Sequence, residues 1–265
     1  MDAKRSPSRW LLREPVGDRP NRLFLFPYSG TGASIYHRWP RKTLTTEICL
    51  IQPPARERRI RDPHYGTYEE LAKQVIENLL PYFDRPFGFF GHCGGALPGF
   101  ATALELHRRG LPTPTCLFIS SQVAPHDGPF GRYLHLDDDE LREELCGFVR
   151  RLGGEPNAEL IEVGLTTLKL DLEANRQYVF AGPVRLPGLL RTISWIEDVE
   201  ILHNQMTGWP LYADTGRFHS TVLPGDHHEF LKAPAALLDA LDDGMEQGRL
   251  AAMATRRAAI GAASR

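Results

Sequence analysis

The sequence lacks any long hydrophobic run and carries little net charge. None of its 265 residues belongs to an apolar stretch approaching the roughly 20 residues of a membrane span, and no such stretch follows the charged N-terminus as in a secretory signal. The formal net charge of −2 gives no electrostatic reason to expect nucleic-acid or membrane partners. The composition therefore indicates a soluble globular protein, and we expect residues 1–265 to form a single α/β domain.

Cysteine is also scarce. The four cysteines have neither a metal-ligand spacing nor a dense disulfide pattern, which indicates a reducing compartment. We therefore expect a cytoplasmic protein with no metal site and no cofactor. Cys49 and Cys116 lie in apolar, strand-like runs and are expected to be inert core thiols. Cys93 differs from them because glycines surround it.

Cys93 stands in the sequence Gly-His-Cys-Gly-Gly at residues 91–95, directly after the apolar run 87–90. This is the form of a nucleophile elbow, with Cys in place of the usual Ser. A sharp strand-to-helix turn lifts the nucleophile clear of the backbone, and the glycines let strand and helix approach closely. The N-terminus of the following helix favours a thiolate and an oxyanion. The alternative is a glycine-rich turn with a buried structural cysteine, which we consider the weaker interpretation.

Apolar runs and helical patterns alternate along the chain. The runs show no period-two alternation, which is typical of strands buried on both faces of a parallel sheet. The expected strands are residues 22–26, 47–51, 87–90, 115–119, 191–196 and 218–223. The sequence therefore predicts an α/β fold in which a mostly parallel central sheet is covered by helices on both faces.

The strand rhythm stops between about residues 122 and 186. Two helix-like segments, 139–152 and 158–178, occupy this interval, and the strand pattern resumes near residue 191. An insertion of this kind between two core strands is the usual form of a lid. We therefore expect a helical lid that lies over Cys93.

A thiol nucleophile needs a base, and the base needs an orienting acid. Cys93, Asp198 and His227 occur in the chain order that α/β-hydrolases use, and each follows a predicted strand. Since the carboxyl ends of parallel strands meet at one edge of a sheet, we expect these three side chains to lie together. The residues that compete for the base and acid roles are His228, Glu197 and Asp214.

Several segments together resemble the type II thioesterases of polyketide and nonribosomal peptide synthesis, which are stand-alone α/β-hydrolases. The resemblance extends from about residue 10 to residue 231 and is carried by residues 25–30, 85–93, 152–156 and 223–227. It implies the α/β-hydrolase fold and action on acyl or aminoacyl thioesters held on the phosphopantetheine arm of an acyl or peptidyl carrier protein. The carrier is then the expected partner.

Carried over position by position, the resemblance makes Cys93 the nucleophile, His227 the base and Asp198 the acid. It implies that the backbone N–H groups of Ser29 and Gly94 form the oxyanion hole. The chain departs from the family pattern in two places. The family normally has Ser where this chain has Cys93, and a Gly-Gly turn before the acid where this chain has Ser-Trp at residues 194–195.

The cysteine leaves two enzymatic interpretations open. Attack by Cys93 on a thioester gives another thioester, so the enzyme-bound acyl group stays activated. A thioesterase would pass it to water, whereas an acyltransferase or cyclase would pass it to an amine, a hydroxyl or a second carrier thiol. We rank hydrolysis first, because the rest of the chain resembles editing thioesterases.

Two further interpretations are weaker. A dienelactone-hydrolase-like enzyme also uses Cys, Asp and His, but the predicted lid and the loop at residues 27–32 argue against it. A non-catalytic binding module would not explain three catalytic residue types at three strand ends.

A basic loop follows the second predicted strand and contains Arg56, Arg58 and Arg59. The simplest interpretation is a solvated turn. The functional alternative is a contact for the phosphopantetheine phosphate or an acidic carrier surface, because guanidinium groups suit phosphate and carboxylate.

Overall fold

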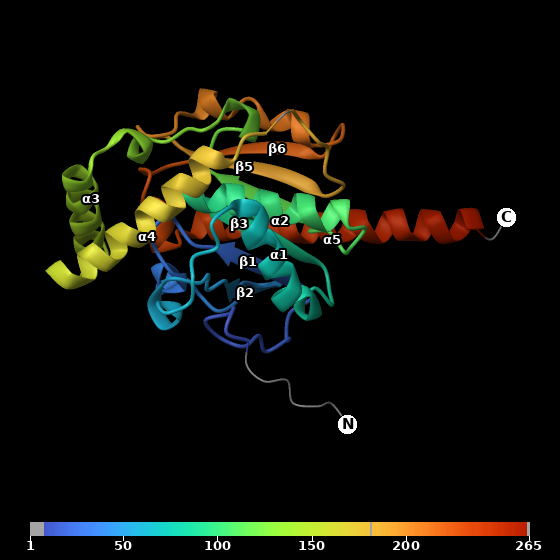
Figure 1. Cartoon of the computed structure of the whole chain (residues 1–265). Helices are drawn as coiled ribbons and strands as arrows, with labels where there is room; N and C mark the ends of the chain where they lie inside the picture. Colours follow the sequence, from blue (N-terminus) through green and yellow to red (C-terminus); the bar gives the residue numbers. More distant parts are fainter. Residues whose placement is uncertain (1–7, 181, 264–265) are drawn as a thin grey trace.

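The structure is a computed structural model that describes residues 8–180 and 182–263. Its centre is a six-stranded sheet, in the order β2-β1-β3-β4-β5-β6, in which every neighbouring pair is parallel (Figure 1). The strands are β1 (Asn21–Phe26), β2 (Thr46–Leu50), β3 (Phe87–His92), β4 (Cys116–Ser120), β5 (Leu189–Trp195) and β6 (Phe218–Leu223). The predicted parallel sheet is confirmed, and all six strands lie where the apolar runs predicted them.

Burial on both faces explains why these strands show no alternation. Every residue of β1 and of β3 is buried. Neighbouring phenylalanines of the two strands pack edge to face, as Phe24 and Phe89 do with ring centroids 6.2 Å apart. Phe90, next along β3, points into the core on the other face of the sheet.

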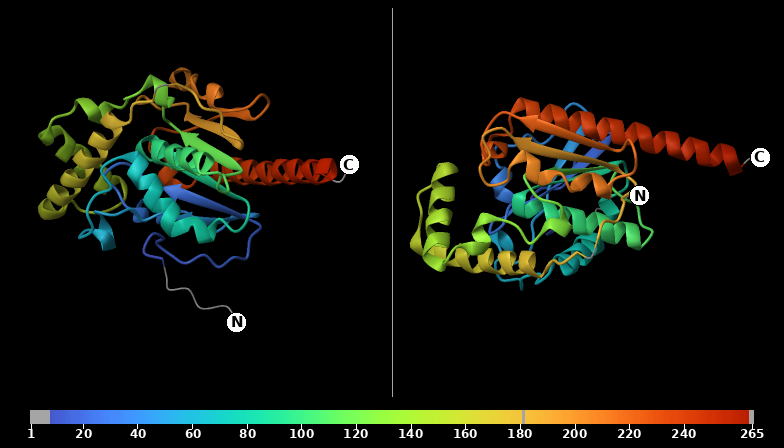
Figure 2. Two further views of the ribbon diagram at one scale, coloured as in Figure 1. Left: turned by 45° about the vertical axis from the view of Figure 1, so that its right-hand side comes forward. Right: turned by 90° about the horizontal axis from the view of Figure 1, so that it is seen from above.

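Helices cover both faces of the sheet, as predicted. Helices α1 (Tyr68–Leu79) and α2 (Ala96–Arg108) lie on one face, and α5 (Ala235–Ala263) lies on the other (Figures 1 and 2). Helix α1 begins after Thr67, whose side chain accepts a hydrogen bond from the backbone N–H of Glu70. None of the helices within the described residues is long and apolar enough to cross a membrane.

Between β4 and β5 the chain leaves the sheet and forms α3 (Asp138–Arg151) and α4 (Ala158–Gln177), which project beyond the sheet in Figure 1. Asp137 opens α3 with a capping box, and the Asn157 side chain caps α4. Both helices lie within a residue or so of their predicted ranges. We refer to residues 122–186 as the insertion.

Candidate active site

Cys93 is the first residue after β3, in a 3₁₀ turn that runs directly into α2. Its backbone has φ +47°, a left-handed conformation that is strained for a residue with a side chain and is typical of a nucleophile elbow. A Cβ atom on Gly91 would lie 2.1 Å from the carbonyl oxygen of Gly95, so strand and helix can meet here only without a side chain. The side-chain amide of Gln122 donates to the Cys93 carbonyl at 3.2 Å and fixes the turn. Cys93 as a residue is partly exposed.

The structure brings His227 and Asp198 together. Nδ1 of His227 lies 3.0 Å from Oδ2 of Asp198, and both side chains are buried. The same oxygen accepts the hydroxyl of Ser121 at 2.7 Å. The other oxygen accepts the backbone N–H groups of Glu200 and Ile201 at 2.8 and 3.0 Å. This carboxylate is held by four donors, so it can orient the imidazole with Nε2 turned away from it.

The protonation of His227 follows from these contacts. Burial lowers the pKa of His227, but the hydrogen bonds with Asp198 and with the Cys93 thiol outweigh it and raise the pKa to about 10. Burial likewise raises the pKa of Asp198, and the bond to His227 reverses that effect and leaves it below its usual value. His227 is therefore an imidazolium at neutral pH, paired with the Asp198 carboxylate and hydrogen-bonded to the sulfur of Cys93.

His228, the competing base, has different surroundings. Its ring packs against those of Tyr28 and Phe148, with centroids 6.3 and 5.9 Å away. Burial, followed by the charge of His227, lowers the pKa of His228 to about 4, so this ring is neutral at neutral pH. The structure places His227 and not His228 beside the acid.

The two competing acids lie elsewhere. A carboxylate oxygen of Glu197 accepts the backbone N–H of Gly225, and the backbone carbonyl of Asp214 accepts the N–H of Arg217. The carboxylate that is hydrogen-bonded to His227 is that of Asp198.

The two expected oxyanion donors lie side by side at the elbow. A Cβ atom on Gly94 would lie 1.8 Å from Oγ and 3.2 Å from the backbone nitrogen of Ser29. Ser29 is the second residue of a tight turn after β1, and Gly94 lies in the turn that leads into α2. Their N–H groups and the N-terminus of α2 therefore gather at the carboxyl edge of the sheet beside Cys93.

Aromatic side chains enclose this edge, and some come from the insertion. Tyr28 stacks on Phe148 of α3, with centroids 5.8 Å apart and ring planes 8° from parallel. The hydroxyl of Tyr28 lies 3.4 Å from Nε2 of His227. Tyr133, also from the insertion, meets Tyr28 edge to face. The insertion thus packs directly against residues of the candidate site.

The Ser-Trp pair at residues 194–195 is compatible with this geometry. Trp195 is buried, and its indole N–H donates to the hydroxyl of Ser120 at 3.3 Å. The same hydroxyl lies 2.8 Å from Nδ1 of His92, the residue before the nucleophile. Trp195 is therefore linked to the elbow through Ser120 and His92. Asp198, three residues after Trp195, still forms its hydrogen bond with His227.

Sequence reasoning missed two residues of the site. Ser121, the first residue after β4, donates to the acid, and the polar pair Ser120-Ser121 after an apolar run was the available signal. Glu200 places Oε2 3.7 Å from Nε2 of His227, with its side chain 12% exposed. No sequence pattern marks Glu200, because only the turn after Asp198 aims its side chain back at the imidazole.

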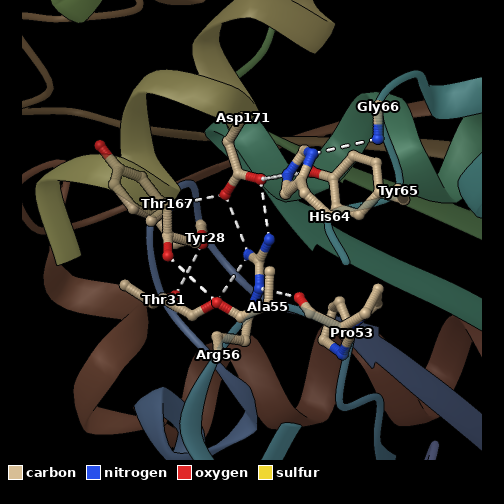
Figure 3. A network of polar contacts seen from close by, with 12 residues as sticks. Tyr28, Thr31, Pro53, Ala55, Arg56, His64, Tyr65, Gly66, Thr167 and Asp171 are labelled. Atoms are coloured by element: carbon tan, nitrogen blue, oxygen red, sulfur yellow. Dashed lines mark hydrogen bonds and ion pairs between the residues drawn. The ribbon is translucent and has the colours of Figure 1, made fainter. Parts of the chain in front are cut away.

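Arg56 does not lie on the surface, contrary to the prediction of a basic contact for a carrier. Its guanidinium is buried and forms a two-pronged ion pair with Asp171 of α4, with Nη2–Oδ1 and Nη1–Oδ2 distances of 2.8 and 2.9 Å (Figure 3). The prediction failed here because a carboxylate 115 residues further along the chain neutralises the charge.

The other two arginines of the loop do not share an exposed surface either. Arg59 is buried, bonds Asp62 at 2.8 Å and lies over the ring of Trp10 at 4.2 Å. Arg58 is exposed and donates to the backbone carbonyl of Leu11. The three guanidinium groups therefore form no single contact surface, and only Arg58 is open to a partner.

Comparison with known proteins identifies the family of the chain. A family model described as a thioesterase domain matches residues 21–244. The chain is 33% identical over 233 residues to the linear gramicidin dehydrogenase LgrE of Brevibacillus parabrevis, covering 84% of this chain and 87% of that protein. It is 28% identical to the gramicidin S biosynthesis protein GrsT of Aneurinibacillus migulanus, covering 83% and 87%.

A solved structure is similar as well. RedJ, a thioesterase from the prodiginine pathway of Streptomyces coelicolor, is 31% identical, with a TM-score of 0.72 and coverage of 90% of this chain and 95% of that one. The parallel sheet of this chain agrees with that structural match and with the family match over residues 21–244. The chain belongs to the thioesterase family and is an enzyme with the α/β-hydrolase fold that acts on thioester bonds.

Proposed function

We propose that the protein is a type II thioesterase of secondary-metabolite biosynthesis. Its substrates are acyl or aminoacyl thioesters on the phosphopantetheine arm of a carrier protein, and its intermediate is an acyl group on Cys93. The observation that carries the proposal is the approach of Cys93, His227 and Asp198 at one edge of the sheet. The relatives GrsT and RedJ, named for gramicidin S and prodiginine biosynthesis, support the pathway class.

The first half-reaction transfers the acyl group to the enzyme. The Cys93 thiolate, paired with the imidazolium of His227, attacks the thioester carbonyl, and the N–H groups of Ser29 and Gly94 stabilise the oxyanion. Collapse of this intermediate breaks the bond to the phosphopantetheine sulfur. The imidazolium of His227 gives its proton to that sulfur, so the arm leaves as a thiol and His227 becomes neutral.

The second half-reaction releases the acid. Neutral His227 takes a proton from a water molecule as its oxygen attacks the acyl-Cys carbonyl. The new tetrahedral intermediate collapses with loss of the Cys93 thiolate, and the free acid departs. His227 is again an imidazolium, held in place by Asp198 throughout, and the resting state is restored.

A second candidate is transfer of the acyl group to another acceptor. The observation in its favour is Cys93 itself, because an acyl-Cys is a thioester and stays activated towards an amine, a hydroxyl or a second carrier thiol. The thioesterase-domain match favours both of these activities over a dienelactone-hydrolase-like one.

The name of the gramicidin relative LgrE, a dehydrogenase, does not alter the proposal. A dinucleotide-binding turn of the Gly-x-Gly-x-x-Gly type has a third small residue where the helix packs on the strand. The corresponding stretch after β1, residues 30–35, reads Gly-Thr-Gly-Ala-Ser-Ile and ends in a bulky residue.

A carrier-transfer assay separates the two candidates. The enzyme is incubated with an acyl-loaded carrier, an unloaded second carrier and an amine, and the products are read by mass spectrometry. A thioesterase releases free acid as the main product. Amide or second-carrier adduct as the main product would instead assign acyl transfer, and no product at all would refute both.

The arginines give a test of how the basic loop acts. Arg56→Ala is expected to lower kcat/KM by the same factor for a carrier-bound thioester and for its N-acetylcysteamine analogue. The reason is that the buried Asp171 carboxylate loses its guanidinium partner, and breaking a buried ion pair typically costs about 3–5 kcal/mol of folding stability. Steady-state kinetics on both substrates and a thermal melt provide the measurement.

Arg58→Ala serves as the matched control, since it removes an exposed guanidinium from the same loop. Exposed pairs are worth about 0.2–1 kcal/mol, so both kinetic constants and the melting temperature should stay near wild type. A loss confined to the carrier-bound substrate in Arg56→Ala would show that this arginine docks the carrier after all.

Glu200 gives a pH test. Its carboxylate is one of the groups that raise the pKa of His227. Glu200→Gln removes a negative neighbour from the imidazolium and lowers the pKa of His227. Because the leaving thiol takes its proton from the imidazolium, the alkaline fall in kcat/KM should move to lower pH, with activity at pH 7 within about twofold of wild type.

The control for Glu200 is Glu143→Gln, which removes an exposed carboxylate from α3. Its pH profile of kcat/KM should coincide with that of the wild type. An unchanged alkaline limb in Glu200→Gln would mean that Glu200 does not act on His227.

A further inference from the structure

Among the residues that the structure describes, Asp171 on α4 is the carboxylate with the most hydrogen bonds. It is buried and accepts five hydrogen bonds from four residues (Figure 3). Oδ2 accepts the backbone N–H of Gly30 at 2.7 Å and Nη1 of Arg56 at 2.9 Å. Oδ1 lies 2.8 Å from Nη2 of Arg56, 2.8 Å from Nε2 of His64 and 2.5 Å from the hydroxyl of Tyr65.

The charge of this carboxylate is secured by its partners. Burial would raise the pKa of Asp171, but the guanidinium of Arg56 and the bonds from His64 and Tyr65 hold the pKa well below its usual value. The hydrogen bond to Gly30 is thus charge-assisted at every pH at which the enzyme would work, and such bonds are shorter and stronger than neutral ones.

The Gly30 N–H belongs to the peptide that joins it to Ser29, the proposed oxyanion donor. Both lie in the turn of residues 28–31, in which the last residue donates its backbone N–H to the first at 3.1 Å. Gly30 adopts φ +72°, and a Cβ atom there would lie 2.9 Å from Cβ of Leu168. Leu168 and Asp171 are one turn apart on α4, so this helix both rests on the turn and bonds to it.

Arg56 completes the arrangement from the other side. Nη1, which pairs with Oδ2 of Asp171, also donates to the backbone carbonyl of Thr31 at 3.0 Å. Thr31 is the last residue of the same turn. The ion pair therefore contacts the peptide group before Gly30 and the peptide group after Thr31, and a shift of either partner would move the backbone that carries Ser29.

We propose that Asp171 is a positioning residue that couples α4 to the oxyanion hole. It holds the turn of residues 28–31 so that the N–H of Ser29 points at the developing oxyanion, and the hole is complete only while α4 lies on the turn. This inference rests on the proposed function, in which Cys93 is acylated and Ser29 stabilises the oxyanion.

The test compares two reactions of the same thiol. Acylation of Cys93 by an N-acetylcysteamine thioester passes through an oxyanion, whereas alkylation by iodoacetamide does not. Both are followed in single turnovers by peptide mass spectrometry, because Cys146 is also partly exposed and must be resolved from Cys93. Loss of one oxyanion donor costs about 10²–10³-fold, so Asp171→Asn should slow acylation by about tenfold or more while alkylation stays within about twofold.

Two further variants make the result decisive. Asp171→Leu with Arg56→Met replaces the whole ion pair by apolar groups and leaves no unpaired charge, in case Asp171→Asn fails to fold. It should show the same selective loss of acylation. Tyr65→Phe removes a donor to Oδ1 but leaves the Oδ2 contact with Gly30, so its acylation should stay close to wild type.

Acylation at the wild-type rate in a folded Asp171 variant, or an equal loss in both reactions, would overturn the inference. Acylation that fell as far in Tyr65→Phe as in Asp171→Asn would also overturn it, because the effect would then not depend on Gly30. Failure of the proposed function is distinct, since the wild-type enzyme itself would then form no acyl-Cys93.

Discussion

Cys93→Ala is expected to abolish turnover of carrier-bound thioesters and to leave the fold intact. The variant removes the thiol that forms the covalent intermediate, and the proposed sequence of steps has no direct attack of water on the carrier-bound thioester. The side chain is partly exposed, so its loss should change the melting temperature little. The measurement is the rate of free-acid release together with a thermal melt.

The matched control is Cys146→Ala, which removes another partly exposed thiol, on α3. It should retain wild-type kinetics. Near-native turnover by Cys93→Ala would contradict the covalent mechanism. A large fall in its melting temperature would show that Cys93 stabilises the fold.

His227→Ala is expected to lower kcat by about 10²–10⁴-fold, the usual contribution of general acid–base catalysis. Without the imidazole no group protonates the departing thiol or accepts the proton of water. His228→Ala changes a neighbouring half-buried ring that is neutral, while Asp198 stays paired with His227, so its effect should be below about tenfold.

Kinetics of the two histidine variants, with circular dichroism to verify folding, provide the measurement. Equal and small losses in both would place the base elsewhere. A larger loss in His228→Ala would assign the base to His228 and leave the His227–Asp198 contact as a structural pair.

Much of the fold was predictable because its signals are local. Strands such as β1 and β3 are buried along their whole length and therefore appear as unbroken apolar runs. The elbow was predictable too, since the close approach of strand and helix leaves no room for side chains at Gly91 and Gly95. The shared location of Cys93, Asp198 and His227 was predictable as well, because each follows a strand and the carboxyl ends of parallel strands meet at one edge of the sheet.

Contacts between distant segments were not predictable in the same way. The sequence shows Arg56 as one of several basic residues in a loop. No nearby residue predicts that Arg56 pairs with Asp171 on the insertion. In the sequence alone, an arginine that will be exposed cannot be distinguished from one that will be buried against a distant carboxylate. Glu200 is a similar case, because its effect on His227 depends on the direction of one turn and not on a motif.

The central claim is that the acyl group passes through Cys93. Intact-protein mass spectrometry after rapid mixing with an acyl-loaded carrier tests it most directly, with peptide mapping to locate the added mass. The account predicts an adduct of one acyl group on Cys93 that forms and decays with turnover and is absent from Cys93→Ala. Free acid released by the wild type, with no adduct on Cys93 at any time, and released equally by Cys93→Ala would contradict it.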